Sequence, residues 1–365
     1  MRERTLDIVI LGLSITSSWG NGHATTYRAL VRALVARGHR VLFLERDALW
    51  YAENRDLPHP PYGRTALYGS LDDLRDRFAE AVRAADVVIV GSYVPEGIAV
   101  GEWALATAGG LTAFYDIDTP VTLAAVSRGR CPYLSRALIP RYGLYLSFTG
   151  GPVLGRVEGT FGAPLARPLY CSVDPDLYYP EAVETAWDLG YLGTYSADRQ
   201  PALERLMLEA ARRWPQGRFV VAGPQYPPEV EWPGNVERVA HLAPPQHRRF
   251  YNAQRFTLNL TREAMRATGF APSVRLFEAA ACGTAIISDA WPGLETLFRV
   301  GDEIALARDT GDVLDLLRHM PDDRREAMAR RARQRVLAEH SADRRAEQLE
   351  SYLCEAREAA HVPYR

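Results

Sequence analysis

The sequence contains no lysine, so all 43 of its cationic side chains are arginine. This absence excludes two chemistries. An enzyme that uses pyridoxal phosphate needs a lysine for the Schiff base, and a Walker-type phosphate loop needs its own lysine. Any anion that the protein binds must therefore be held by arginine, backbone amides or helix N-termini, and we expect no pyridoxal phosphate cofactor.

Cysteines are few and far apart. Cys131, Cys171, Cys282 and Cys354 form no Cys-x-x-Cys pair, and none has a histidine at zinc-ligand spacing, so we expect no metal site. No apolar stretch reaches the roughly 18 residues of a membrane span, and the N-terminus lacks a signal-peptide pattern. These absences predict a cytoplasmic protein with reduced thiols and no transmembrane segment.

Net charge is also small, at −2 for 365 residues. Because no broad basic surface is available to neutralise a phosphate backbone, we expect no nucleic-acid partner. The apolar share of 47% is typical of a globular protein, and at roughly 150 residues per domain the length predicts two domains.

Short apolar runs alternate with helical patterns along the first half of the chain. Residues 6–13 are typical of a buried strand, and residues 26–37 repeat alanine and leucine at helical spacing before Gly38. Further strands are expected at 39–44, 86–90 and 111–115, and helices at 71–85 and 97–108. This alternation predicts a doubly wound α/β domain.

A second alternating run follows an irregular, proline-bearing linker at 170–184. Strands are expected at 189–192, 218–222, 235–239, 256–260 and 284–288, and helices at 202–214, 246–252 and 273–282. An arginine-rich segment at 322–357 keeps apolar residues at helical spacing and reads as a solvated helix. We therefore predict an α/β protein of two Rossmann-like domains facing a cleft, residues 1–175 and 176–340, with a C-terminal helix at 341–365 that packs back on the first domain.

The loop after the first strand lacks the Gly-x-Gly-x-x-Gly fingerprint of dinucleotide-binding proteins, which argues against a nicotinamide cofactor. It ends instead in Gly20, Asn21, Gly22 and His23 at the start of a helix. Small residues there let a phosphate or an acceptor approach the backbone, and the helix N-terminus favours negative charge. His23 is a candidate general base, and the alternative is a histidine that only lines the helix start.

Two carboxylates, Asp116 and Asp118, follow the strand predicted at 111–115. Open α/β sheets bind ligands at the carboxyl ends of their strands, so this position favours a functional role, and Asp118 is the stronger candidate. Asp118 also stands where an N-cap would precede a helix beginning near Pro120, and the two roles are compatible.

The richest stretch runs from Asn259 through residues 273–289 to 301–304, and it resembles the nucleotide-sugar binding half of GT-B glycosyltransferases. The resemblance is strongest to the CgeB-like (spore maturation protein) branch of the group 1 glycosyltransferases. That branch has Phe-Glu, small residues and Cys-Gly before a strand, then Asp, Gly and a later Glu-Ile. Similar motifs at 190–195 and 221–224 and at Asn235 extend the match over roughly 189–340.

The resemblance implies roles for particular residues. Glu278 matches the glutamate that receives the ribose hydroxyls of the donor, which suits a carboxylate because it accepts two hydrogen bonds. Arg199 matches the basic residue that binds phosphate, and Arg275 is a second candidate. Further donor-binding candidates in the matching stretches are Gly193, Thr194, Gly223, Ser273 and Asn259.

Phe270 stands where many retaining members of this family have a second glutamate, which leaves the retaining or inverting class open. The resemblance implies a hexosyltransferase-like enzyme that moves a sugar from a nucleotide diphosphate sugar, with a UDP-sugar favoured, to a hydroxyl or amine. The acceptor is a small molecule, a glycan or a natural product, and no metal is required. Two alternatives remain: a nucleotide-sugar epimerase of the same fold, and a protein that binds nucleotide sugars without catalysis.

Overall fold

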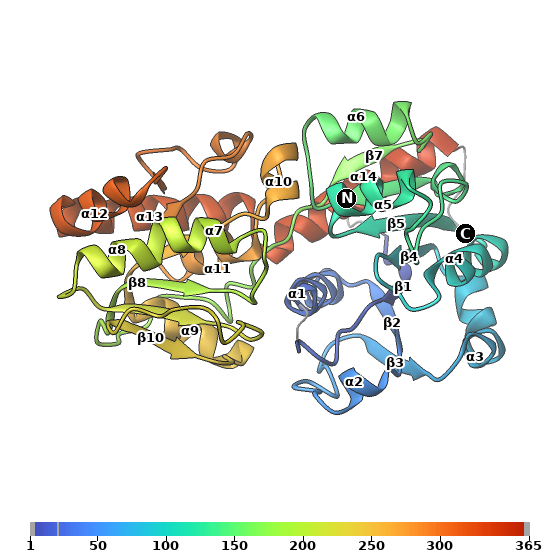
Figure 1. The fold of residues 1–365 in the computed structure, drawn as a ribbon. Coiled ribbons are helices and arrows are strands. Elements are labelled where there is room, and N and C mark those ends of the chain that lie inside the picture. The colour runs from blue at the N-terminus through green and yellow to red at the C-terminus, as the bar shows by residue number, and fades with distance from the viewer. Residues whose placement is uncertain (1–3, 20–21, 361–365) are drawn as a thin grey trace. The chain divides into compact units, whose positions relative to one another are not determined.

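The computed structural model describes residues 4–19 and 22–360, and the chain divides into two compact units. Unit 1 contains Met1–Tyr170 and Ala342–Arg365, and unit 2 contains Cys171–Ser341. In the part of the chain that the structure describes, each unit has one parallel β-sheet flanked by helices (Figure 1).

The sheet of unit 1 has the strand order β3-β2-β1-β4-β5-β6-β7, counted over the described residues. Its strands are β1 (Asp7–Gly12), β2 (Arg40–Arg46), β3 (Arg64–Tyr68), β4 (Val87–Gly91), β5 (Leu111–Asp116), β6 (Leu144–Ser147) and β7 (Ala166–Pro168). Its helices include α1 (His23–Ala36), α2 (Leu49–Ala52), α3 (Leu71–Ala84), α4 (Gly97–Thr107), α5 (Thr119–Ser127) and α6 (Pro152–Gly159). Every pairing in this sheet is parallel.

The sheet of unit 2 has the order β10-β9-β8-β11-β12-β13. Its strands are β8 (Trp187–Leu192), β9 (Phe219–Ala222), β10 (Val236–Val239), β11 (Gln254–Asn259), β12 (Ala285–Ser288) and β13 (Ala305–Leu306). Its helices include α7 (Gln200–Leu203), α8 (Glu209–Arg213), α9 (Pro244–Asn252), α10 (Glu263–Thr268), α11 (Val274–Ala281), α12 (Thr310–His319) and α13 (Asp322–Glu339), and a π-helical turn, Glu204–Leu208, joins α7 to α8.

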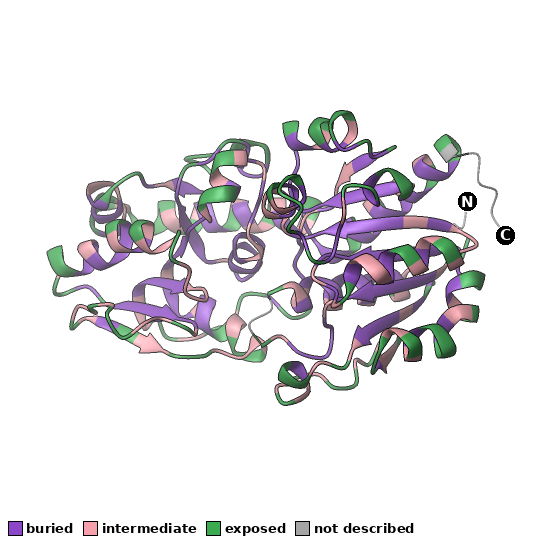
Figure 2. Ribbon diagram, turned by 45° about the vertical axis from the view of Figure 1, so that its right-hand side comes forward, coloured by how far each residue is buried: buried purple, intermediate pink, exposed green. Residues whose placement is uncertain are grey.

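The predicted α/β architecture is confirmed, because the apolar runs of the sequence are the buried strands of the two sheets. β4 and β9 are buried over their whole length, and Figure 2 shows the strands of both sheets as the most buried elements. A parallel sheet is covered by helices on both faces, so its central strands carry continuous apolar runs instead of an alternating pattern. Gly38, expected as a helix stop, follows α1 with a φ of 95° that glycine adopts without steric cost.

The arginine-rich segment at 322–357 consists of two helices, and the second corresponds to the C-terminal helix predicted at 341–365. α13 ends at Glu339, and α14 (Ala342–Ala360) begins after His340 and Ser341, where the chain leaves unit 2 and returns to unit 1.

α14 is held on unit 1 by ion pairs as well as by packing against α1. Glu350 accepts two hydrogen bonds from the guanidinium of Arg37, at 2.7 and 2.6 Å, and lies 2.7 Å from Nε2 of the buried His39. Glu355 pairs with Arg167. Glu350 and His39 are buried, and these paired charges fix where the helix docks.

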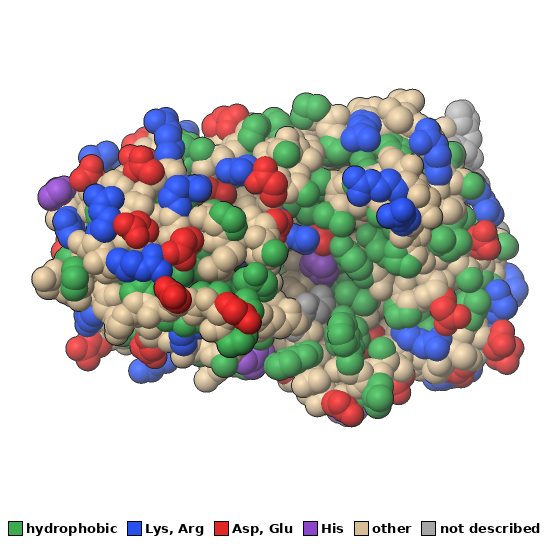
Figure 3. Space-filling view, in the orientation of Figure 1, with side chains coloured by type: hydrophobic (Ala, Val, Ile, Leu, Met, Phe, Trp, Pro, Cys, Tyr) green, Lys and Arg blue, Asp and Glu red, His purple; other side chains and the backbone are tan. Residues whose placement is uncertain are grey.

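The surface of unit 2 mixes charges of both signs. On the face shown in Figure 3, arginines are interspersed with acidic side chains. One ion pair of unit 2 joins Arg212 of α8 to Glu204 of the π-helical turn. Among residues 4–19 and 22–360, no helix combines the length and the apolarity that crossing a bilayer needs.

Candidate active site

Each sheet contains a point at which the chain reverses the direction in which it adds strands. In unit 1 this point lies between β1 and β4, and in unit 2 it lies between β8 and β11. Open α/β sheets bind ligands in the crevice that forms outside the carboxyl ends of the strands at such a switch point. The residues that follow these strands are therefore the first candidates for a site in each unit.

Arg275 spans the switch point of unit 2. Its Nε donates to the carbonyl of Leu192 at the end of β8 (2.5 Å), and its Nη1 donates to Oδ1 of Asn259 at the end of β11 (3.1 Å). The guanidinium carbon lies 4.8 Å from the centroid of the Tyr191 ring, and only 5% of the residue is exposed. A buried cation is thus fixed between the two strands that flank the predicted ligand crevice.

Two glycines keep the backbone beside Arg275 free of side chains. A Cβ on Gly193 would lie 2.6 Å from the hydroxyl of Tyr191 and 3.0 Å from Nη2 of Arg275. Gly223 has a φ of 142°, and a Cβ there would lie 2.1 Å from the carbonyl oxygen of Gly193. Gly223 therefore requires glycine, whereas a side chain at Gly193 would force Tyr191 and Arg275 to shift, and the loops after β8 and β9 meet through bare backbone.

The remaining donor candidates surround this centre. Arg199 precedes α7, and its Nη2 donates to the carbonyl of Thr194 (2.7 Å) in the loop after β8. Ser273 caps α11, where its Oγ accepts from the backbone amide of Arg275 (3.4 Å). The structure thus brings Gly193, Thr194, Arg199 and Asn259 together with Arg275 at one edge of the sheet.

Glu278 lies one turn further along α11 and has different partners. Its Oε2 accepts a hydrogen bond from the hydroxyl of Tyr251 (3.0 Å) and lies 4.0 Å from Nδ1 of His247, whose own neighbour is the hydroxyl of Tyr178 (3.4 Å). Burial, and then the charge of Glu278, holds the pKa of Tyr251 well above its usual range, so the phenol remains a donor. The sequence analysis missed these three partners, because they come from α9 and from the chain before β8 and are joined to Glu278 only by folding.

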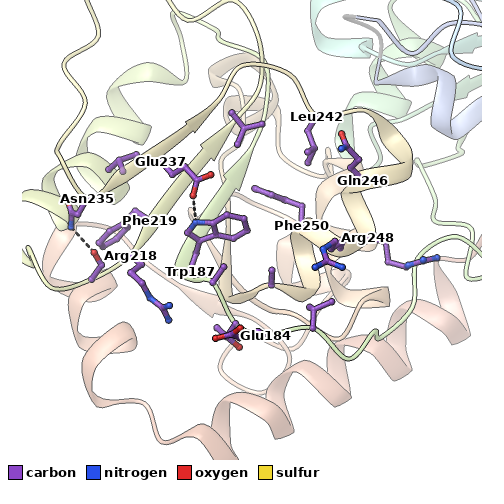
Figure 4. Close-up of a pocket in the computed structure, with 18 of the residues that line it drawn as sticks. Glu184, Trp187, Arg218, Phe219, Asn235, Glu237, Leu242, Gln246, Arg248 and Phe250 are labelled. Carbon is purple, nitrogen blue, oxygen red and sulfur yellow. Dashed lines mark hydrogen bonds between the residues drawn. The ribbon is translucent and has the colours of Figure 1, made fainter.

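A pocket of about 1110 Å³ in unit 2 lies away from these residues. Trp187, Arg218 and Asn235, at or just before the amino ends of β8, β9 and β10, are part of its lining. Figure 4 shows Trp187 beside Phe250 of α9, with the indole nitrogen donating to Glu237 (2.9 Å). The pocket therefore opens at the amino edge of the sheet and shares no residue with the donor candidates, which follow the carboxyl ends.

In unit 1, the loop after β1 leads to His23, the first residue of α1, with Gly22 at the N-cap position. Gly20 and Asn21, the other two candidates of this loop, lie outside the described residues. The described part of the loop is held by Glu45 of β2, whose fully buried carboxylate accepts hydrogen bonds from a set of neighbouring backbone and hydroxyl groups. These come from Ser14 Oγ (3.0 Å), Ile15 N (2.7 Å), Thr16 N (3.0 Å) and Thr16 Oγ1 (2.6 Å).

Aromatic rings enclose the imidazole of His23. The Tyr93 ring is nearly parallel to it, with centroids 6.0 Å apart and planes at 25°, and the Phe148 ring meets it edge-on at 6.3 Å. Tyr93 lies in the loop after β4, and His23 begins the helix that follows β1. Both residues therefore follow the two strands that flank the switch point of unit 1. Sequence reasoning did not single out Tyr93, because a lone tyrosine after a strand carries no motif.

Asp118 occupies the N-cap position of α5, as its sequence context suggested, but its side chain makes no capping hydrogen bond within the described part of that helix. Its Oδ2 accepts a hydrogen bond from the hydroxyl of Tyr93 (2.8 Å) instead. The side chain thus lies with Tyr93 and His23 on the carboxyl side of the sheet, which makes it available for proton transfer in a way that a capping carboxylate is not.

Asp116 lies beneath this cluster and is fully buried. It accepts hydrogen bonds from the hydroxyls of Tyr145 (2.5 Å) and Thr122 (2.7 Å) and from the backbone amide of Asp118 (3.2 Å). Burial outweighs these bonds and raises the pKa of Asp116 to about 6. Asp116 therefore has a structural position, whereas Asp118 is the carboxylate next to the imidazole cluster.

Comparisons of sequence and structure identify known proteins that this chain resembles. Residues 199–351 match a family model described as glycosyl transferase-like. The structure is similar to sucrose-phosphate synthase from Thermosynechococcus elongatus, with 16% identity over 98% of this chain and 100% of that chain and a TM-score of 0.68. The protein has the GT-B fold. Anabaena HepE in complex with UDP and glucose gives 13% identity over 96% of this chain and 100% of that one, with a TM-score of 0.70.

A third similar structure is an alpha-glucosyltransferase in complex with UDP, with 12% identity, 96% and 100% of the two chains covered, and a TM-score of 0.71. No curated protein matches the chain in sequence. These findings confirm the predicted fold of two Rossmann-like domains, and the family match covers the segment that holds most of the donor candidates of unit 2.

Proposed function

We propose that this GT-B protein is a glycosyltransferase that moves a hexose from a nucleotide diphosphate sugar, with a UDP-sugar favoured, to a hydroxyl or amine of an acceptor. Unit 2 binds the donor and unit 1 binds the acceptor. Within the glycosyl transferase-like family we place the chain in the CgeB-like branch of the group 1 enzymes, on its Phe-Glu and Cys-Gly motifs.

The observation that carries this proposal is the position of Arg275. A buried guanidinium at the switch point, beside Gly193 and Gly223, is suited to a diphosphate, because the planar cation donates several hydrogen bonds and bare backbone lets the phosphates approach. Arg199, which donates to the loop that follows β8, adds a second cation. HepE and the alpha-glucosyltransferase, which share the fold, have UDP bound in their structures.

The chemistry then divides between the units. A base of unit 1, His23 or Asp118, accepts the proton of the acceptor hydroxyl. The oxygen of that hydroxyl forms a bond to the anomeric carbon of the donor sugar. The bond from that carbon to the donor phosphate breaks, and the nucleoside diphosphate leaves with the electron pair. Arg275, Arg199 and backbone amides stabilise the charge that develops on it. The proposal includes neither a metal nor pyridoxal phosphate.

A thermal-shift panel of UDP, GDP, TDP and CMP sugars tests the donor class. A rise in melting temperature with one nucleotide series identifies the base, because a ligand that binds only the folded state stabilises it. Incubation of the preferred donor with and without acceptors then separates transfer from the alternatives. Epimer formed without acceptor indicates an epimerase, and binding without any product indicates a non-catalytic binding protein.

Glu278→Gln tests the ribose contact. The amide oxygen can still accept from Tyr251, so the fold should persist, but the charged acceptor is lost. Hydrogen bonds to charged groups contribute about 1.5 to 3 kcal/mol, so nucleotide affinity should fall about tenfold or more. A 2′,3′-dideoxy nucleotide should bind wild type weakly and be nearly indifferent to the change.

Titration calorimetry measures both ligands, and Glu204→Gln, an exposed carboxylate of unit 2, is the matched control. Equal binding of the natural nucleotide to wild type and Glu278→Gln would assign Glu278 to the Tyr251 cluster alone and would displace the proposed ribose site.

A further inference from the structure

The loop from β4 to α4 holds two residues in a left-handed backbone conformation that is unfavourable for side chains other than glycine. Tyr93 has a φ of 65° and Glu96 has a φ of 55°. Glu96 is exposed and pairs with Arg46 at the surface (3.0 Å). Tyr93 is half-buried and points to the candidate bases, so only at Tyr93 does the strained backbone direct a side chain into the site.

Hydrogen bonds to the neighbouring strand hold this loop in place. The amide of Ser92 donates to the carbonyl of Tyr115 (2.9 Å), and its hydroxyl accepts from the amide of Ile117 (3.1 Å). The ring of Tyr93 also packs against Tyr133, with centroids 4.7 Å apart. These contacts over-determine the position of Tyr93, which is what a strained residue needs in order to persist.

Tyr93 is in contact with both candidate bases. Its hydroxyl donates to Oδ2 of Asp118 at 2.8 Å, and its ring faces the imidazole of His23 at 6.0 Å. We propose that Tyr93 is a positioning residue that joins His23 and Asp118 into one proton-transfer unit. This inference rests on the proposed function, in which one of these two residues accepts the proton of the acceptor.

The chemistry of the phenol suits this role. Burial, and then the charge of Asp118, raises the pKa of Tyr93, so the hydroxyl stays protonated and donates to the carboxylate throughout the neutral range. The donated bond fixes the direction of one carboxylate oxygen, and the ring restricts the plane of the imidazole. Removing the hydroxyl should therefore disturb turnover through Asp118 and leave donor binding intact.

A double-mutant cycle tests the coupling. Tyr93→Phe should lower acceptor-dependent kcat about tenfold to a hundredfold, as expected for a hydrogen bond to a charged group, with the Kd for the donor unchanged. In an Asp118→Asn background the same change should have little further effect, because the carboxylate that the hydroxyl holds is already gone. An equal fold-loss in both backgrounds would overturn the proposal and leave Tyr93 a packing residue.

Glu96→Gly is the matched control in the same loop. It changes the other left-handed residue to one that tolerates this conformation, and it should leave kcat unchanged. A loss comparable to that of Tyr93→Phe would mean that any disturbance of the loop lowers turnover, and this would also overturn the assignment.

A second measurement does not depend on activity. The ring current of Tyr93 should shift the Hε1 resonance of His23, which His23→Gln identifies among the eight histidines. Tyr93→Phe should keep this shift, whereas Tyr93→Asn, which tolerates the left-handed backbone, should remove it. An unchanged resonance in Tyr93→Asn would refute the contact itself. If the contact is present but wild type transfers sugar to no acceptor, the proposed function has failed and not the placement of Tyr93.

Discussion

At its switch point unit 1 presents an imidazole, a phenol and a carboxylate, whereas unit 2 presents a guanidinium, an amide and bare glycine backbone. The two sheets are built in the same way, with parallel strands that reverse their order once, so topology does not account for the difference. The side chains at the strand ends do. The candidate general bases lie in one unit, and the groups that stay cationic or donate from the backbone lie in the other.

Under the proposed function, this contrast corresponds to two roles supported by one architecture. A site that binds a diphosphate needs fixed donors and close approach of the backbone, which Arg275, Gly193 and Gly223 provide. A site that takes a proton from an acceptor needs groups held in a defined direction, which the contacts of Tyr93 provide to His23 and Asp118. The comparison therefore predicts that substitutions in the two units affect different kinetic quantities.

The largest expected effect comes from the bases of unit 1. His23→Gln and Asp118→Asn, made separately, should show a loss of about 10² to 10⁴ in acceptor-dependent kcat in whichever variant removes the general base, because general-base catalysis contributes about that much. Donor affinity, measured by calorimetry, should not change, since the proposal assigns donor binding to unit 2. Unchanged kcat in both variants would show that neither residue of unit 1 accepts the proton, and the proposed difference in role between the two units would then be wrong.

Asp116 should give unit 1 a pH-dependent stability. Its pKa of about 6 in the folded protein lies above the ordinary value of 3.8, so between these values the folded state binds more protons than the unfolded state. The free energy of unfolding therefore falls as pH rises from about 4 to about 6, by about 3 kcal/mol from this group.

Asp116→Asn should remove this dependence, so that its melting temperature rises relative to that of wild type across the same pH range. Asp289→Asn should change the pH dependence in the same direction, because burial also raises the pKa of that carboxyl group in unit 2. A constant difference between wild type and Asp116→Asn at every pH would show that Asp116 does not titrate in that window.

The smallest of the three effects concerns the arginines of unit 2. Arg199→Ala should weaken the nucleoside diphosphate about tenfold or more and the free nucleoside much less, since a guanidinium contact recognises the anion. Arg275→Met should do the same, with a lower melting temperature because Asn259 loses its partner. Calorimetry with UDP and with uridine separates the two ligands. Equal losses of affinity for both ligands would show that these arginines do not contact phosphate. Unit 2 would then have no demonstrated cationic site for the diphosphate.

Strong local patterns explain which elements the sequence predicts. β1, β4 and β9 are short apolar runs with clear limits, and α3 begins at the side-chain cap of Ser70, so periodicity and composition identify them. β3 was missed because it is an edge strand whose residues are mostly only half-buried, β6 was missed although its four residues are buried, and β7 and β13 were missed because they have three and two residues. Such elements form only because a neighbouring strand offers hydrogen-bond partners.

The residues of the candidate site could be identified from the sequence, but their pairings could not. Composition alone limited the cations to arginine, local sequence context singled out His23 and Asp118, and the family resemblance implied Arg275 and Glu278. No local pattern could pair Tyr93 with Asp118, which are 25 positions apart, or Tyr251 with Glu278, which are 27 apart. The first pair forms because β4 and β5 are neighbours in the sheet, and the second forms because α9 packs against α11.

By itself, the sequence determined the alternation of strands and helices, the absence of lysine chemistry and the residue types at the strand ends, because these depend on local periodicity and composition. Only the tertiary structure decided that Arg275 bridges two strands, that Asp118 accepts from Tyr93 instead of capping α5, and that Glu278 turns to Tyr251. The physical reason is that a side chain takes the partner that burial and geometry bring within hydrogen-bond distance, and that partner is usually remote in sequence.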